Sequence, residues 1–509
     1  MKTSNGSSMI TRPSNNSNQN KPAIEPDDDG WVTILSRQSR KEAKRKSRIV
    51  QQYTINDLPN SVLVHILSFL PTIQAAQTSV LSMRWKYLWA YVPALIIKGY
   101  GYNGGYEMQK FLQFCRSSYL RQITLMLRDP LVHESCIKWV DFAMKHKEVE
   151  ELNLQLMNRN RFNMHTPNSL PRNIFSHSQS LRVLVLYGCE LRNIGEVDLR
   201  NVRKLHFKKV DVVGNLLNDL LAACPRAEIL KLEHSDSVID LSANLPELKK
   251  LKLRECNQMK SARLTVPNLQ VVKIEDSFES GIEFFQLCGM VNLMEAYIIH
   301  NEDGDYQVYN GTYQVYANLL QILGQAKQLT VKCSSLEIMY NWSQVIADCS
   351  AMKVTSFELI SLDDCYGISS FILALLKKLP NLEEFRLHKI CDIDSRNSPR
   401  DEESSNGPNY GDSLPIDCLQ QCLKRISIVD YNNEKMEFEL VKFLLQNSIV
   451  LENVCFLNCF GELKDYLELI EVLETCKASP KAEIVFEDDL ETLIYSDYSD
   501  ASDFSYATS

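Results

Sequence analysis

Two pairs of cysteines are the side chains best spaced for metal binding in this sequence. Cys418 and Cys422 are four residues apart, and so are Cys455 and Cys459. On a helix this spacing sets two thiols on one face, but zinc sites more often use two-residue gaps with a second close pair or a histidine. Cys455 also falls in a predicted strand, where a residue four positions away is too distant. We therefore interpret these residues as buried structural cysteines and expect no metal site and no cofactor.

The sequence also lacks a recognisable catalytic constellation. Its nine histidines are scattered, and no HExxH motif, phosphate-binding GxxxxGK[ST] loop, GxSxG turn or pair of kinase motifs is present. We therefore expect a non-catalytic protein that acts by binding. An enzymatic site hidden among residues 300–399 is the alternative.

Composition and charge narrow the class of partner. The chain has 509 residues, enough for two or three domains, and its net charge of −9 argues against nonspecific binding to nucleic acid. Fifteen cysteines are spread from Cys115 to Cys476 without clustering, and the start of the sequence lacks the apolar segment of a secretory signal. We expect reduced thiols and a location in the nucleus or the cytoplasm.

Residues 54–95 have the apolar spacing of three short helices. Asp57 is a candidate N-cap for the first helix, with Pro59 in its first turn. Pro71 ends that helix, Thr72 can cap the second, and Pro93 ends the third. The three predicted apolar stripes consist of Leu58, Val62, Leu63, Ile66, Leu67 and Leu70; Ile73, Ala76, Val80 and Leu81; and Trp85, Leu88 and Trp89.

This segment carries more apolar surface than so small a core can bury, so we expect part of it to face another protein. No Asp, Glu, Lys or Arg occurs from Asn60 to Met83, as in a membrane span. However, polar residues recur within the run and Pro71 divides it, whereas a span needs roughly 20 mostly apolar residues. We expect no membrane segment. A cap on the end of a larger domain is the other alternative, and it is compatible with docking.

From about residue 100 to 390 the chain repeats the phrase L-x-x-L-x-L. Starting from Leu184, successive copies lie 21, 25, 21 and 21 residues apart, within the leucine-rich-repeat range of roughly 20–29. Each copy predicts a short strand, and since one repeat cannot bury its own face, neighbours must stack. The copies lie at residues 149–154, 181–186, 202–207, 227–232, 248–253 and 269–274, with fainter ones at 293–298, 354–359 and 382–387.

These repeats predict an α/β solenoid, a leucine-rich-repeat horseshoe with parallel strands on the concave face, preceded by the small three-helix segment. Short helices such as the one expected at Leu216–Cys224 would cover the convex side. An ordinary parallel α/β sheet is the alternative.

The middle residue of each L-x-L phrase points away from the core, onto the concave face. Residues 181–275 contain 16 Lys or Arg and 12 Asp or Glu, a net charge of +4. A basic concave face suits an acidic or phosphorylated partner, and a merely solvated face is the alternative. The predicted partner-binding residues are His206, Lys231, Lys252, Lys273 and Tyr297.

Three polar segments are expected outside the folded parts. Residues 1–50 are predicted to be disordered and contain a basic run from Lys41 to Arg48, which indicates either nuclear import or a solvated linker. Residues 391–413 read as a flexible loop. Residues 488–509 form an acidic, disordered tail.

The sequence LPNSVLVHILSFLPTIQAAQTSVLSMRWKYLW resembles an F-box of the plant type, in which LP–VL–ILSFLP precedes A–TSVLS–RW–LW. Asn60 and Met83 depart from that pattern, where an acid and a lysine are common. The resemblance implies docking onto a Skp-family adaptor and through it a cullin. The expected adaptor-binding residues are Leu58, Pro59, Val62, Leu63, Ile66, Leu67, Leu70, Val80 and Leu81, whereas Trp85, Leu88 and Trp89 are expected to hold the three helices together.

Residues 414–487 are expected to continue the solenoid. Helices are predicted at 436–446 and 462–476, and strands around Val454 to Phe456 and at 482–486. The order CLKRISIV, ELVKFLLQNSIVLENV and KASPKAEIVF resembles the FBD domain that ends many plant F-box proteins.

Together these features predict a substrate-recognition subunit of an SCF-type cullin–RING ubiquitin ligase. The F-box at residues 54–95 would hold the adaptor, and the irregular repeats at 100–390 would hold an unknown target protein. Ubiquitin transfer would then need no residue of this chain, because the receptor acts by proximity. The alternative is an interaction scaffold that binds the Skp-family adaptor, or another partner, without a degradative role.

Overall fold

The structure is a computed structural model. By its internal contacts the chain divides into two compact units, Met1–Leu63 and Val64–Ser509. The described residues are 25–26, 32–33, 54–99, 109–111, 113–116, 119–127, 130–146, 148–156, 169–276, 284–300, 312–333, 346, 349–361, 368–389, 415–431, 435–458 and 463–487. The predicted basic run at 41–48, the loop at 391–413 and the tail at 488–509 lie outside these residues, as does most of the segment 1–50.

The first unit contains a strand pair and the start of the F-box segment. Strands β1 (Glu25–Pro26) and β2 (Val32–Thr33) pair antiparallel. A 3-10 turn, η1 (Ile55–Asp57), precedes helix α2 (Asn60–Ser68), which continues into the second unit. The prediction that Asp57 caps α2 is wrong. Its Oδ2 atom accepts hydrogen bonds from the backbone N of Thr54 (2.7 Å) and from Thr54 Oγ1 (2.9 Å), which close η1 instead.

The rest of the F-box segment is more tightly wound than predicted. The second helix consists of α3 (Thr72–Gln77) followed by a 3-10 turn, η2 (Thr78–Val80), and the third is the 3-10 helix η3 (Trp85–Tyr91). Thr72 does not cap α3, which begins after Pro71. Instead, Thr72 Oγ1 accepts a hydrogen bond from the backbone N of Ile96, at 2.9 Å.

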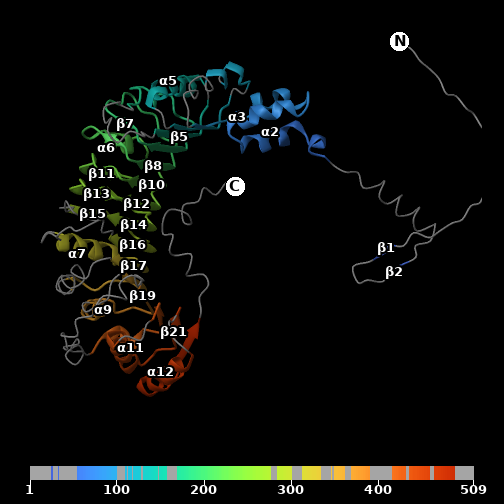
Figure 1. Ribbon diagram of the computed structural model, residues 1–509. Helices are drawn as coiled ribbons and strands as arrows, with labels where there is room; N and C mark the ends of the chain where they lie inside the picture. The colour runs from blue at the N-terminus through green and yellow to red at the C-terminus, as the bar shows by residue number, and fades with distance from the viewer. Residues whose placement is uncertain are drawn as a thin grey trace, which may run out of the picture. The chain divides into compact units, whose positions relative to one another are not determined.

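Fifteen strands of the second unit form one parallel ladder. Every predicted L-x-x-L-x-L copy coincides with a strand of this ladder, so the α/β solenoid is confirmed. Figure 1 shows the strands β8 to β17 stacked in order, with helices along one side. The strands are β3 (Ala94–Gly99), β4 (Gln122–Leu127), β5 (Glu151–Leu156), β6 (Val183–Tyr187), β8 (Lys204–Lys208), β10 (Ile229–Glu233), β12 (Lys250–Arg254), β14 (Val271–Asp276), β16 (Glu295–His300), β17 (Gln328–Cys333), β18 (Ser356–Ser361), β19 (Glu384–Lys389), β20 (Arg425–Val429), β21 (Asn453–Leu457) and β22 (Glu483–Glu487).

Stacking the strands in register is what buries the leucines. Leu205, Leu230 and Leu251 pair across β8, β10 and β12, and all three are buried. Burying one such side chain contributes about 1.5–3 kcal/mol. The solenoid is therefore held by a continuous row of like residues, each contributed by a different repeat.

A tight turn recurs where the concave strands end. The residue after each of six strands has a positive φ, between 46° and 67°. Its backbone N–H donates, at 2.7–3.2 Å, to the last carbonyl of the next strand or, for Glu255, to the last but one. This conformation is costly for residues with a Cβ, so the ladder hydrogen bond must hold it in place. The six residues are Gly188, Lys209, His234, Glu255, Asp430 and Asn458.

The helices lie on the convex side of the ladder, as α6, α7, α9 and α11 show in Figure 1. The predicted helix at Leu216–Cys224 is confirmed as α6. The helices of the solenoid are α5 (Pro130–His146), α6 (Leu216–Ala222), α7 (Thr312–Leu323), α9 (Ile368–Leu376), α10 (Asp417–Gln421), α11 (Lys435–Asn447) and α12 (Leu463–Cys476).

Helices are not the only convex elements, which corrects the prediction. The connections after β10, β12 and β14 contain short strands, which pair as a second parallel ladder of β11 (Asp240–Asn244), β13 (Ser261–Thr265) and β15 (Phe284–Cys288). A smaller parallel pair joins β7 (Glu190–Leu191) and β9 (Asp211–Val212). On β13 the buried Ala262 and Leu264 alternate with more exposed residues, and on β15 Phe285 and Leu287 do the same, a pattern that suits a strand.

The predicted elements of residues 414–487 are confirmed as α11, β21, α12 and β22. Strand β20 pairs with β19, and β21 and β22 follow in parallel. The same ladder therefore runs from β3 to β22 without a change of direction. Among the described residues, no helix is long and apolar enough to cross a membrane.

Gly188 gives a direct test of the turn at the strand ends. Its φ is +67°, and a Cβ on this residue would lie 2.2 Å from the carbonyl oxygen of Leu156. We expect Gly188→Ala to lower the free energy of unfolding by about 2–4 kcal/mol, because the clashing atom belongs to the backbone. Urea unfolding measures this change.

The matched control is Lys209→Ala, at the equivalent turn one repeat later. Lys209 already has a Cβ at a φ of 50° and is exposed. The control should change stability by less than about 0.5 kcal/mol. Equal effects of the two substitutions would contradict this explanation of the turn.

Candidate protein-docking surfaces

The F-box segment exposes an unusual number of large apolar side chains. Val80 is 85 % exposed, Met83 81 % and Leu81 64 %, all within or just after η2. Soluble proteins rarely leave such groups in water without a binding role. The exposed large hydrophobic residues of the segment are Ile55, Val62, Ile66, Phe69, Ile73, Val80, Leu81, Met83, Tyr87 and Tyr91.

The structure divides the predicted adaptor-binding residues into two groups. Val62, Ile66, Val80 and Leu81 are exposed, as is Pro59, while Leu58 and Leu70 are partly exposed. Leu63 and Leu67 are buried, with 0 % and 1 % of their surface exposed, so placing them on the contact surface was wrong. They lie four residues apart on the inner side of α2, and Val62 and Ile66 lie beside them on the outer side.

Trp85 and Leu88 lie in the interior as expected, while Trp89 contacts residues that follow the three helices. Trp85 and Leu88 are buried on η3, and Trp89 packs on Phe111 and Phe114 with ring centroids 6.5 and 6.3 Å apart. These side chains hold the segment against the start of the solenoid, within the second unit.

The sequence did not predict the exposed cluster that Tyr87, Tyr91 and Arg116 form in this part of the chain. Arg116 donates to the hydroxyl of Tyr91 (3.1 Å) and lies over the rings of Tyr87 and Tyr91. Arg116 is 25 residues from Tyr91 and follows a stretch without clear periodicity, so no local signal in the sequence pairs them. Phe69, Ile73 and Met83 were also missed. Their exposure depends on where α2 and α3 end.

The concave face is a regular grid of side chains. The central position of each strand pairs in register with the central positions of its neighbours, across the whole ladder. In order these residues are Ile96, Thr124, Asn153, Val185, His206, Lys231, Lys252, Lys273, Tyr297, Thr330, Glu358, Arg386, Ser427, Cys455 and Val485. The residues predicted as partner contacts, His206 to Tyr297, thus lie side by side on five adjacent strands.

Positive charge gathers on four of these strands, in an area that we call the basic patch. It consists of the concave positions of β8, β10, β12 and β14: Lys204, His206, Lys208, Ile229, Lys231, Glu233, Lys250, Lys252, Arg254, Val271, Lys273 and Glu275. Seven Lys or Arg against two Glu leave a net charge of +5. Adjacent strands are about 4.8 Å apart, so these charges must be compensated locally.

Glu233 provides one centre of compensation. It is buried, and its carboxylate lies 3.2 Å from Lys252 Nζ, 3.6 Å from Lys208 Nζ and 3.6 Å from His206 Nε2. Burial raises the pKa of Glu233, but the interactions with His206 and Lys252 outweigh burial and hold the pKa well below its usual range. Glu233 is therefore ionised in the folded protein at neutral pH.

Glu275 provides the second centre of compensation, on β14, two repeats after Glu233. Its carboxylate lies 3.1 Å from Arg254 Nε and 3.7 Å from Lys273 Nζ. Burial lowers the pKa of Lys273, and the nearby Glu275 acts in the opposite direction. Arg254 also approaches Glu255 (3.4 Å), which pairs with His234 at 2.7 Å.

These contacts correct the prediction for Lys252. Only 4 % of Lys252 is exposed, so it cannot present its ammonium group to a partner and instead neutralises Glu233. His206, Lys231, Lys273 and Tyr297 keep partial exposure. The two carboxylates of the patch are themselves buried, at 2 % and 6 % exposed, so a molecule approaching the patch meets chiefly cationic groups.

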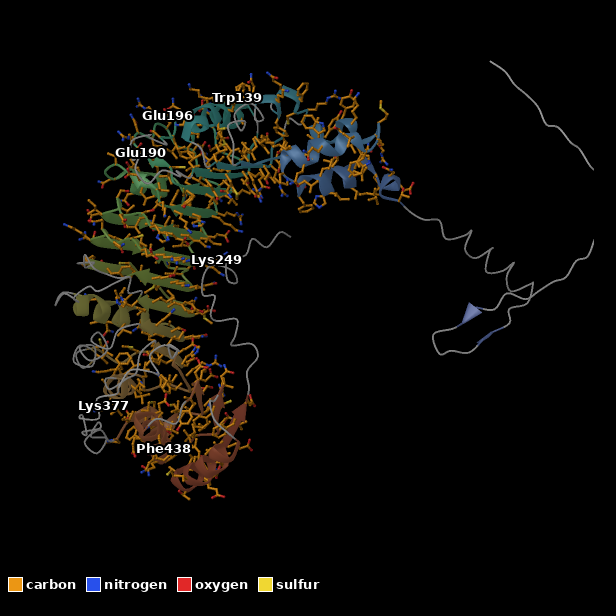
Figure 2. The ribbon with its side chains drawn as sticks, viewed as in Figure 1. Trp139, Glu190, Glu196, Lys249, Lys377 and Phe438 are labelled. Atoms are coloured by element: carbon orange, nitrogen blue, oxygen red, sulfur yellow. The ribbon has the colours of Figure 1, made fainter. Side chains whose placement is uncertain are left out.

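Other ion pairs line the edge where the strands begin. Lys249 and Arg203 contact Glu228 at 2.9 and 2.8 Å. In Figure 2 Lys249 lies on the strand side of the molecule, whereas Glu190 and Glu196 lie on the opposite side with β7.

Of the paired cysteines that were expected to be buried, Cys418 is buried, whereas Cys422 and Cys455 are partly exposed. Cys418 is buried on α10, and its Sγ donates to the carbonyl of Leu376 at 3.5 Å. Burial raises the pKa of the Cys418 thiol to about 12, and burial does the same for Cys189 and Cys224. Cys459 lies outside the described residues. Among the described residues, no group of three or more His, Cys, Asp or Glu could hold a metal ion.

Comparison with known proteins finds two domain families in this chain. The family described as "At1g61320/AtMIF1, LRR domain" matches residues 117–485, and the F-box domain family matches residues 55–95. The first match covers nearly three quarters of the chain. The leucine-rich-repeat match covers most of the parallel ladder, and the F-box match covers the helical segment that precedes the ladder in the sequence.

Relatives from Arabidopsis thaliana share this organisation. An F-box/LRR-repeat protein is 28 % identical over 267 residues, which is 49 % of this chain and 70 % of the relative. An FBD-associated F-box protein is 25 % identical over 445 residues (85 % of this chain, 99 % of the relative), and an F-box/FBD/LRR-repeat protein is 23 % identical over 447 residues (85 % and 99 %). The FBD designation rests on such names, since no family model for that domain matches.

Glu233 tests whether a buried carboxylate organises the basic patch. We expect Glu233→Gln to lower the free energy of unfolding by about 3 kcal/mol at pH 7, because the buried Lys252 loses its counter-charge. The folded-state pKa of Glu233 is depressed, so its contribution is present above the ordinary carboxyl value of 4.5 and is lost as the pH falls below it. When the pH is lowered from 7 to 4, the free energy of unfolding of the variant should therefore fall by less than that of the unmodified protein. Urea unfolding at each pH measures both.

Glu228→Gln is the matched control. Glu228 also contacts two cations, but it is partly exposed at the strand edge, where ion pairs are worth up to about 1 kcal/mol. A loss at Glu233 no larger than at Glu228 would mean that the patch does not depend on its buried carboxylate.

Proposed function

The chain belongs to the family of F-box proteins with leucine-rich repeats, and from this premise we propose that it is the substrate-recognition subunit of an SCF-type cullin–RING ubiquitin ligase. F-box proteins in general act as substrate adaptors. In this proposal the F-box segment docks onto a Skp-family adaptor, the adaptor links it to a cullin, and the repeats hold the target protein. The chain itself contributes position and not catalysis. This role would place the protein in the nucleus or the cytoplasm.

The observation that carries the proposal is the apolar surface around α2, α3 and η2. Val80 and Leu81 expose most of their side chains, and Ile66, Phe69 and Ile73, which come earlier in the F-box segment, are exposed as well. An interface core of this kind is depleted in charge and rich in large apolar groups. The exposed and partly exposed residues proposed to contact the adaptor are Leu58, Pro59, Val62, Ile66, Leu70, Val80 and Leu81.

The buried residues of the segment support this surface from beneath. Leu67 and Trp85 are almost fully buried, and Thr72 ties α3 to the edge strand β3 through the backbone N–H of Ile96. An edge strand of a sheet otherwise offers unpaired groups to other chains. The F-box segment therefore closes the first edge of the ladder while its outer residues remain available.

The basic patch supports the second half of the proposal. Its cations other than Lys252 keep full or partial exposure while its carboxylates are buried, so it suits an acidic or phosphorylated segment of a target. The patch begins at β8, four strand spacings from β3, or roughly 19 Å. A target held there leaves the outer side of α3 and η2 open to the adaptor.

Adaptor docking is tested with a double substitution at the most exposed residues. We expect Val80→Glu with Leu81→Glu to weaken binding of a purified Skp-family adaptor by at least about 100-fold, because two apolar anchors are replaced by charges. Isothermal titration measures the affinity. Unfolding by urea should be unchanged, since both side chains are exposed.

Val291→Glu controls for adding charge to an exposed apolar site. Val291 is 78 % exposed and lies between β15 and β16, far along the ladder from the F-box. This variant should bind the adaptor as the unmodified chain does. If the double variant binds normally, or if the unmodified folded chain does not bind, the proposed role is wrong.

A further inference from the structure

The basic patch stands out from the rest of the concave face by its charge. From β3 to β6 the concave positions carry one Lys and one Glu, a net charge of zero. From β16 to β22 they carry five Glu and three Lys or Arg, a net charge of −2. Among the described strands, β8 to β14 therefore form the one strongly cationic area of this face, at +5.

The chain also carries a segment of the opposite charge. Residues 488–509 contain six Asp or Glu and no Lys or Arg. They directly follow β22, which belongs to the same ladder as the patch. Strand β22, from which they continue, carries Glu483 and Glu487 at its concave positions, and these two carboxylates repel an acidic segment.

We propose that the acidic segment 488–509 docks on the basic patch of its own chain and competes there with an acidic target. The docking itself follows from charge and reach. The competition with a target rests on the proposed function, in which the patch holds the protein to be recognised.

The segment is long enough for this contact. The near edge of the patch, β14, lies seven strand spacings from β22, or roughly 34 Å at about 4.8 Å for each spacing. The 22 residues of the segment span up to about 75 Å when extended and have an average end-to-end distance of roughly 26 Å as a flexible chain. Asp500 and Asp503, 13 and 16 residues after β22, can thus reach β14 and β12 without full extension, whereas Asp497 reaches only β14 and only when its ten residues are fully extended.

Tethering makes even weak docking effective. A short flexible tether gives an effective concentration on the order of 1 mM, so an intrinsic Kd of about 0.25 mM is enough to occupy about four fifths of the patches. The contact involves exposed charges such as Lys204, so salt should weaken it strongly. A target with more negative charge, or with phosphate groups, would displace the segment.

The experiment compares the full chain with a charge-neutralised version of it. In the tail-neutral chain the six acids are replaced by their amides, as in Asp497→Asn and Glu491→Gln. A fluorescein-labelled peptide of residues 488–509 is titrated with each chain, and fluorescence anisotropy reports binding. We expect the tail-neutral chain to bind the peptide at least about fivefold more tightly than the unmodified chain, whose own segment occupies the patch.

Two further variants locate the binding. Lys204→Glu with Lys231→Glu in the tail-neutral chain should weaken peptide binding by about tenfold or more, since both residues keep their exposure on the patch. Lys353→Glu with Lys377→Glu makes the same change of charge at two exposed lysines outside the patch, and it should change binding less than about twofold. Raising NaCl from about 50 to 300 mM should reduce binding to the tail-neutral chain by about tenfold.

Equal binding of the peptide to the unmodified and tail-neutral chains would overturn the proposal and leave the patch to an acidic segment of a separate protein. No binding to the tail-neutral chain, or unchanged binding after Lys204 and Lys231 are reversed, would also overturn it. The assay contains no adaptor. Failure of adaptor docking therefore leaves this result unaffected, and failure here leaves adaptor docking intact.

Discussion

The parallel register of the fifteen-strand ladder is the constraint on which the other features depend. No single repeat can bury its two inward leucines, so every strand must align with its neighbours residue by residue. That alignment also fixes the outward side chains in rows about 4.8 Å apart. When Lys231, Lys252 and Lys273 occupy one row, their repulsion has to be offset within the sheet. Glu233 and Glu275 do this from buried positions in the next row, and the result is a surface that is cationic outside and neutralised beneath.

The same constraint explains what the sequence could predict. Period-two burial is visible within one repeat, so the strands from β5 to β19 that carry the L-x-x-L-x-L phrase were located, and Trp85 and Leu88 were assigned to the interior correctly. The burial of Lys252 was not predictable in this way, because it depends on the contact of Lys252 with Glu233, which belongs to the preceding repeat. In α2, spacing showed an apolar stripe but not which of its sides is covered, so Leu63 and Leu67 were placed on the contact surface although they are buried. The strands β11, β13 and β15 were missed because they do not carry the L-x-x-L-x-L phrase, although the buried side chains of β13 and β15 alternate with more exposed ones.

The F-box segment has two tasks that use different side chains. Its inner residues, with Thr72 and Trp85 among them, close the first edge of the ladder, and this explains why so short a segment can be stable. Its outer residues, Val80 and Leu81 above all, remain in water. A surface that serves only as a cap would have no need of them. The chain matches both the F-box family and the leucine-rich-repeat family, and the basic patch that we propose as its recognition surface starts four strands further along.

Amide hydrogen exchange of the full chain, with and without a purified Skp-family adaptor, tests the central claim most directly, because it reports on both surfaces at once. The account predicts slower exchange at residues 66–83, which include α3 and η2, and unchanged exchange in β8, β10, β12 and β14. Unchanged exchange at residues 66–83 in the presence of saturating adaptor would contradict it. So would protection over the basic patch, since that would make the patch and not the F-box segment the adaptor's docking surface.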